Sequence, residues 1–77
     1  MDFSENLKSL RKQCRIDQAK LANELKVSPK TVSHWETGYT EPSIAQLISL
    51  SKFFNVSLDE LITGKWKSRL KFKQMLN

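Results

Sequence analysis

Residues that begin and end helices recur along this chain at intervals that fit only short helices. Side chains able to cap a helix start stand at five places, namely Asp2, Asp17, Ser28, Ser43 and Ser57. Gly38, Asn55 and Gly64 can take the left-handed conformation that often follows a helix end. The linkers between these segments hold only a few residues. We therefore expect an all-α fold, a compact bundle of five helices.

Apolar residues at helical spacing indicate which face of each helix is buried. Asp2 with Glu5, and Ser57 with Glu60, form predicted capping boxes, and Pro42 breaks the chain before the fourth helix. The predicted inward residues are Phe3, Leu7, Leu10 and Cys14 in the first helix, Leu21, Ala22 and Leu25 in the second, Val32 and Trp35 in the third, Ile44, Leu47, Leu50, Ser51 and Phe54 in the fourth, and Leu58, Leu61 and Ile62 in the fifth.

The third predicted helix, residues 29–37, has a polar face that packing does not require. Only Val32 and Trp35 are apolar between the Ser28 cap and Gly38. The linker "KVSP" is so short that the second and third helices must cross steeply. A helix is about 10–12 Å across and the DNA major groove about 12 Å wide, so this face could enter the groove or simply be solvated. The residues on the face are Lys30, Thr31, Ser33, His34 and Thr37.

The stretch "QAKLANELKVSPKTVSHWET", residues 18–37, resembles the helix-turn-helix of phage repressor and Cro-like regulators, the Xre family. The resemblance continues through "EPSIAQLISLSKFFNVSLDELITG" and covers roughly residues 3–64, most of the chain. It implies a lambda-repressor-like DNA-binding domain at residues 1–64. The implied function is that of a sequence-specific transcriptional regulator of double-stranded DNA, with residues 29–37 in the major groove. Some relatives are antitoxins that also bind a protein toxin, and this alternative stays open.

The same resemblance implies roles for individual residues. Pro29, Lys30, Thr31 and His34 occupy base-reading positions. Positions that contact the DNA backbone are occupied by Gln18, Ser28, Ser33, Tyr39 and Thr40. Relatives also pair an arginine with a glutamate where this chain has Arg11 and Glu36. Lys26 replaces the family's usual glycine, so the turn is either strained there or rearranged.

Composition argues against several other classes of protein. The chain has one histidine and one cysteine, and no clustered acids of a metal site, so we expect no enzyme, metal or cofactor. A single cysteine cannot form an internal disulfide, and the N-terminus has no apolar run, so we expect a cytoplasmic protein with no secretion signal. No apolar run is long enough to cross a membrane.

The last thirteen residues carry the whole net charge of +5, because residues 1–64 hold eight basic and eight acidic residues. In this basic tail, residues 65–77, the mostly apolar positions Trp66, Ser68, Leu70 and Phe72 alternate with five bases. A period of two predicts a strand, which could pair with its copy in a homodimer and cover Ile48, Phe53 or Ile62. A basic arm on phosphates, a helical tail docked through Trp66 and Leu70, and binding to a membrane surface are the alternatives. A homodimer would suit a pseudo-palindromic operator.

Overall fold

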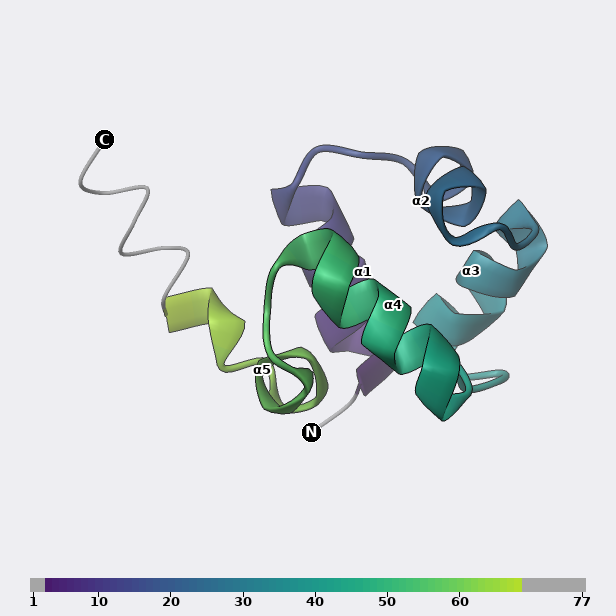
Figure 1. Ribbon diagram of the computed structural model, residues 1–77. Coiled ribbons are helices and arrows are strands. Elements are labelled where there is room, and N and C mark those ends of the chain that lie inside the picture. The colour runs from purple at the N-terminus through teal and green to yellow at the C-terminus, as the bar shows by residue number, and fades with distance from the viewer. Residues whose placement is uncertain (1–2, 69–77) are drawn as a thin grey trace.

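Five helices and one further helical turn make up the computed structural model, which describes residues 3–68 (Figure 1). The helices are α1 (Phe3–Gln13), α2 (Gln18–Leu25), α3 (Pro29–Thr37), α4 (Ile44–Phe54) and α5 (Leu58–Thr63). Residues 66–68 form the additional turn. The all-α prediction is confirmed, and α3 has the predicted bounds.

Capping residues define these helix ends because a short helix leaves a large share of its backbone groups without internal partners. The side chains of Asp17, Ser28, Ser43 and Ser57 each accept a hydrogen bond from a backbone N–H in the first turn, as predicted. Asn55 ends α4 in the left-handed region, and Gly38 and Gly64 do the same for α3 and α5. The predicted Asp2 cap lies outside the described residues.

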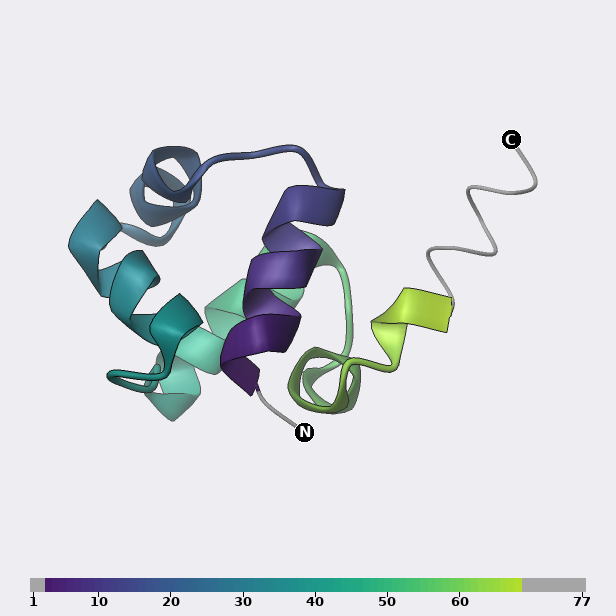
Figure 2. The same ribbon diagram turned by 180° about the vertical axis from the view of Figure 1, so that it is seen from behind.

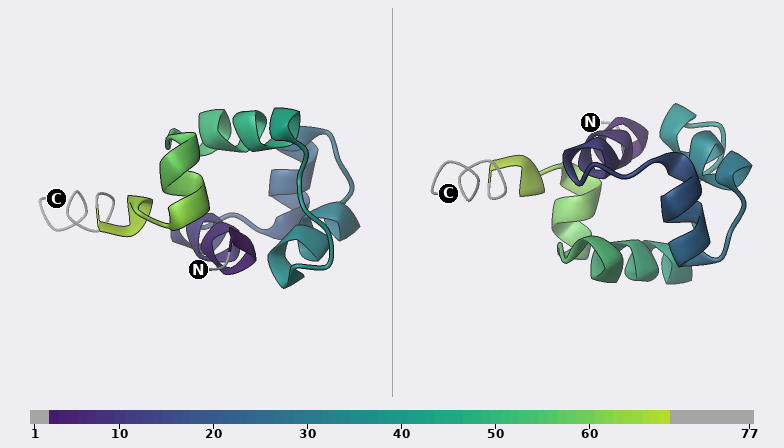
Figure 3. Two further views of the ribbon diagram at one scale, coloured as in Figure 1. Left: turned by 90° about the horizontal axis from the view of Figure 1, so that it is seen from below. Right: turned by 90° about the horizontal axis from the view of Figure 1, so that it is seen from above.

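The core fills the space between the helices, with α2 and α3 at one end of the molecule and α5 at the other (Figure 3). Apolar residues from all five helices and from the segments after α4 and α5 form it. Its members are Leu7, Leu10, Leu21, Ala22, Val32, Trp35, Leu50, Phe54, Val56, Leu61 and Trp66.

Four residues that the apolar pattern predicts as inward are exposed. Cys14 lies past the end of α1, next to Arg15, which takes a positive φ of 59°. Ile44, in the first turn of α4, is 76% exposed, and Leu58 and Ile62 of α5 are exposed as well. Periodicity identifies residues that share a helix face, but the length of the core decides how far along that face burial extends.

The predicted strand in the tail is wrong for its described part, because residues 66–68 are helical. The Trp66 side chain is only 3% exposed and belongs to the core of the helical domain, beyond the predicted boundary at residue 64. Ile48, Phe53 and Ile62 remain exposed. The predicted docking of a helical tail through Trp66 is the alternative that matches, and Leu70 and Phe72 lie outside the described residues.

Gly64 allows the chain to leave α5 close to α1. It takes a φ of +81°, and a Cβ added to it would lie 2.7 Å from Oδ1 of Asn6. The Nδ2 group of Asn6 donates to the carbonyl oxygen of Ile62 at 3.0 Å. Any side chain at residue 64 would displace Asn6, so the glycine permits the close contact that leads Trp66 into the core.

Candidate nucleic-acid interface

A tight turn joins α2 to α3 through the residue that departs from the expected glycine. Lys26 has φ 59° and ψ 41°, its N–H donates to the carbonyl of Asn23, and the N–H of Val27 donates to that of Ala22. Val27 packs against the core. Of the two alternatives for Lys26, the structure shows the left-handed, strained conformation and not a rearranged turn.

Replacing Lys26 by glycine is expected to raise the free energy of unfolding by about 1 kcal/mol, because a β-carbon is disfavoured at positive φ. The gain is reduced by the greater freedom of glycine in the unfolded chain. Denaturant melts would measure it. Asn55→Gly is the control, because Asn55 has the same φ sign but asparagine tolerates it better. A loss of stability in Lys26→Gly would mean that the lysine side chain makes a compensating contact.

Two buried anchors hold α3 with its polar face outward. Val32 and Trp35 are 0% and 2% exposed. On the other side, Lys30 and Thr37 are exposed, and Thr31, Ser33 and His34 are partly exposed. Together α2 and α3 occupy the end of the molecule away from α5 and the 66–68 turn (Figure 2). The predicted base-reading residues of α3 are therefore accessible to a large ligand.

The start of α3 uses some of the predicted contact groups internally. Ser28 Oγ accepts from the backbone N–H of Thr31 at 3.1 Å and also lies 2.9 Å from Thr31 Oγ1. Pro29 follows as the first helical residue. These bonds give the Thr31 hydroxyl a defined position at the exposed end of α3.

A buried ion pair connects α1 to the last turn of α3. Arg11 Nε and Nη2 donate to the two carboxylate oxygens of Glu36 at 2.6 and 3.0 Å, and Arg11 Nη1 donates to the carbonyl of Ile16 at 2.8 Å. The Glu36 side chain is 1% exposed and that of Arg11 10%. Hydrogen bonding to Glu36 raises the pKa of the Arg11 guanidinium above its ordinary value, although burial opposes this. The predicted pair is present and explains an acid at a helix C-terminus, where the dipole alone disfavours it.

Gln18, a predicted phosphate contact, extends the same network. Its Nε2 donates to Glu36 Oε1 at 3.0 Å, a contact that no sequence pattern indicated. The neighbouring Asp17 carboxylate accepts from the Lys20 N–H at 2.7 Å, which uses one of the free amides at the start of α2 and adds a negative charge beside them. The Gln18 amide is therefore held in place, and its contact with phosphate stays a prediction.

After α3, the backbone folds back onto His34. The N–H groups of Tyr39 and Thr40 both donate to the carbonyl of His34, at 2.9 and 3.3 Å. The rings of Tyr39 and His34 lie 4.7 Å apart at an interplanar angle of 58°. The structure thus brings together a predicted base reader and a predicted backbone contact, and the helix-ending Gly38 is the only sequence signal of this return.

Other chemistry has little support in this part of the chain. Partial burial raises the pKa of the Cys14 thiol although the residue is exposed overall, which disfavours the nucleophilic thiolate. Within residues 3–68, no group of three histidine, cysteine, aspartate or glutamate side chains could hold a metal ion. No helix in the same range is long and apolar enough to span a membrane.

Comparison with known proteins identifies the family. A helix-turn-helix family model matches residues 7–61. The HTH-type transcriptional activator BcrR of Enterococcus faecalis is 42% identical over 65 residues, which are 84% of this chain and 32% of BcrR. The uncharacterized HTH-type transcriptional regulator YqaE of Bacillus subtilis is 36% identical over 97% of this chain and 67% of its own length. This chain therefore spans about a third of one relative and about two thirds of the other.

A solved structure gives the same result at the level of the fold. The P22 c2 repressor, in complex with the synthetic operator 9T, matches with a TM-score of 0.77 and 36% identity. The match covers 83% of this chain and 97% of that chain. The family model covers residues 7–61, which include the capped α2 and α3 and the tight turn at Lys26 that joins them. The chain therefore belongs to the phage repressor and Cro-like (Xre) helix-turn-helix family.

Proposed function

We propose that this protein is a transcriptional regulator that binds double-stranded DNA in a sequence-specific manner, with α3 in the major groove. The observation that carries the proposal is the polar face of α3, which is fixed by two buried anchors and a capped start and left open to a ligand. The similarity to a repressor bound to its operator supports this orientation. A regulator of this kind must have access to DNA, so the proposal includes a cytoplasmic location.

The position of each side chain determines whether we assign it a contact with base edges or with the DNA backbone. Lys30, Thr31 and His34 offer donors, acceptors and a methyl group to base edges, while Pro29 provides shape and apolar contact only. Gln18, Tyr39, Thr40 and the hydroxyls of Ser28 and Ser33 would contact the sugar–phosphate backbone. Backbone contacts orient the protein on the duplex, and base contacts select the sequence.

Lys30→Ala is expected to weaken binding to the preferred site by roughly 1–3 kcal/mol and to relax the preference at one or two base pairs. Lysine is a donor to the O6 and N7 acceptors of guanine, so a variant without it loses a base contact. Selection of bound sites from a random DNA library, followed by affinity measurement at fixed salt, would test this. Gln18→Ala should instead weaken binding to all sequences alike.

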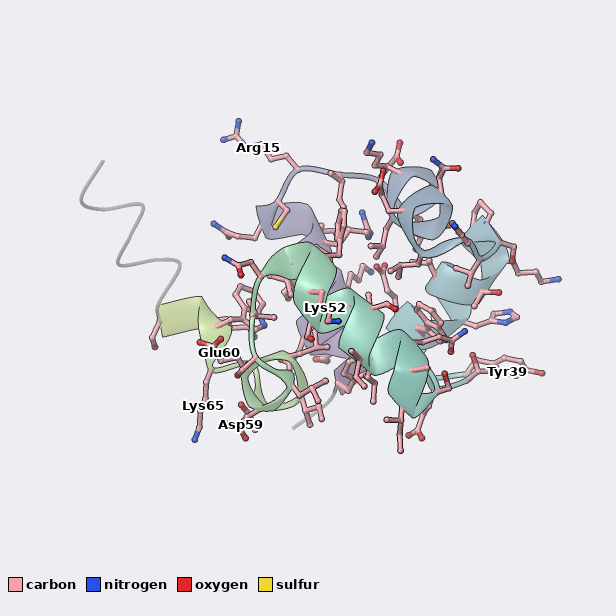
Figure 4. The ribbon with its side chains drawn as sticks, viewed as in Figure 1. Arg15, Tyr39, Lys52, Asp59, Glu60 and Lys65 are labelled. Carbon is pink, nitrogen blue, oxygen red and sulfur yellow. The ribbon has the colours of Figure 1, made fainter. Side chains whose placement is uncertain are left out.

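Lys52→Ala is the matched control, because it removes the same charge from an exposed position on α4 (Figure 4). It should change affinity far less than Lys30→Ala and leave the base preference as it is. Equal effects of the two substitutions, or unchanged affinity and preference in Lys30→Ala, would show that α3 does not read bases.

The proposal also includes a homodimer on a pseudo-palindromic operator. Two recognition helices about 34–36 Å apart would meet successive major-groove faces on one side of the duplex. Because residues 66–68 are helical and Trp66 is in the core, a ribbon made of residues 65–73 no longer supports the dimer. Sedimentation of the full chain, with and without an operator, would measure the association state, and binding of one protomer per operator would contradict the dimer.

A further inference from the structure

The ring contact between His34 and Tyr39 is unusual because Tyr39 has no part in the core. Its side chain is 76% exposed and projects from the end of the molecule that carries α3 (Figure 4). The aromatic residues Trp35, Phe54 and Trp66 are buried. Tyr39 therefore adds no buried area to the core, and the aromatic contact that it makes is the one with His34.

The backbone fixes Tyr39 relative to His34. Gly38, at a φ of +80°, reverses the chain, and the N–H of Tyr39 then donates to the His34 carbonyl at 2.9 Å. The second bond to that carbonyl, from the Thr40 N–H at 3.3 Å, closes the turn. The two rings consequently meet at 4.7 Å between centroids, within the range of tilted aromatic pairs.

An imidazole without such a neighbour is poorly oriented. The terminal torsion of histidine has broad, roughly two-fold minima, so the ring can turn over and exchange the places of its two nitrogens. In neutral histidine one nitrogen donates and the other accepts, and reading a base edge depends on which one is presented. A ring packed against the imidazole restricts this motion before DNA is bound and lowers the ordering cost of binding.

We propose that Tyr39 is a positioning residue for base recognition, whose aromatic ring holds the His34 imidazole in the orientation that reads the DNA. This inference rests on the proposed function, and it gives Tyr39 a role in sequence selection beyond the expected contact with the backbone. The ring carries this role, and the hydroxyl does not.

The free protein provides the first test, because the chain contains one histidine and one tyrosine. The imidazole proton signals of His34 in the NMR spectrum are expected to carry a ring-current shift from Tyr39. Tyr39→Leu should abolish this shift, and Tyr39→Phe should retain it. Both variants preserve the backbone N–H that closes the turn, and the exposed position makes them tolerable to the fold. Unchanged His34 signals in Tyr39→Leu would overturn the inference.

The second test measures base preference with the full chain and a site selected from a random DNA library. Tyr39→Leu is expected to weaken binding to that site about two- to tenfold, the equivalent of a lost aromatic pair, and to relax the preference at the base pair that His34→Ala also relaxes. Tyr39→Phe should keep the base preference of the parent, and the loss of its hydroxyl contact with the backbone should weaken binding to all sequences alike. In a His34→Ala background, Tyr39→Leu should produce no further change in preference.

Three outcomes of this second test would overturn the inference. Tyr39→Leu could weaken all sequences equally, as expected for Thr40→Val, the control for a backbone contact in the same loop. Tyr39→Phe could relax the base preference as much as Tyr39→Leu, which would assign the effect on sequence selection to the hydroxyl. The two substitutions at residues 34 and 39 could also act independently. If Lys30→Ala alters the preference while Tyr39→Leu does not, only this inference fails. If Lys30→Ala and His34→Ala both leave it unaltered, the proposed function fails with it.

Discussion

Arg11→Met is expected to lower the free energy of unfolding by about 3–5 kcal/mol, the usual effect of removing one partner from a buried ion pair. The loss arises mainly from Glu36, whose carboxylate would remain buried. It would keep the hydrogen bond from the neutral Gln18 amide but lose both hydrogen bonds from the guanidinium group. Methionine preserves much of the apolar volume, so the change reports the charge. Urea or guanidinium melts would measure it.

A double-mutant cycle would separate the pair from its surroundings. Arg11→Met together with Glu36→Gln should cost much less than the sum of the single substitutions, because no buried charge is then left without a partner. Lys20 and Glu24 provide the control pair, at 3.2 Å and with side chains 57% and 38% exposed. Lys20→Ala should cost no more than about 0.5 kcal/mol. Small, additive effects at Arg11 and Glu36 would mean that the two side chains do not interact.

Trp66→Ala is expected to be about as destabilising, by roughly 3–5 kcal/mol, because it empties a large volume of the core. The indole is 3% exposed and packed with residues of the helical domain, although it lies after the last of the five helices. The Lys67 ammonium lies over its ring, 5.8 Å from the ring centre. Thermal or denaturant unfolding of the variant would test whether the domain needs this residue.

Trp66→Phe is the matched control for this experiment. Within residues 3–68 the buried Nε1 group of Trp66 has no hydrogen-bond partner, so a phenylalanine would lose some apolar contact and no described hydrogen bond. It should therefore retain most of the stability that alanine loses, and Lys67→Ala at the neighbouring exposed position should have little effect. A Trp66→Ala variant as stable as the parent would show that the helical domain does not need Trp66, in agreement with the predicted boundary at residue 64.

The local features of the fold could be predicted because they depend on residues close together in the chain. A Ser or Asp side chain at the start of a helix accepts from an N–H three residues later, so the caps of α2 to α5 follow from the sequence. Gly38, Asn55 and Gly64 end helices for a similarly local reason. The bounds of α3 and the two residues that anchor it follow from these capping and helix-ending residues together with the helical spacing of apolar residues.

The candidate site was only partly predictable. The polar face of α3 follows from the same local rules, because two anchors on a helix determine which side chains point outward. The bond between Gln18 and Glu36 joins residues eighteen positions apart, and no local pattern indicated it. The contact between His34 and Tyr39 depends on the shape of the turn at Gly38, which a sequence pattern locates but does not describe.

The sequence by itself determined the five helices between residues 3 and 63, the caps of α2 to α5 and the outward face of α3, since these depend on backbone hydrogen bonding within a few residues. The resemblance to relatives added the pairing of Arg11 with Glu36. Only the tertiary structure decided that Cys14 and Ile44 are exposed and that Trp66 is buried, because burial depends on which helices pass nearby. Alternation in the tail predicts a strand, but residues 66–68 form a helical turn, and the Trp66 indole lies in the core.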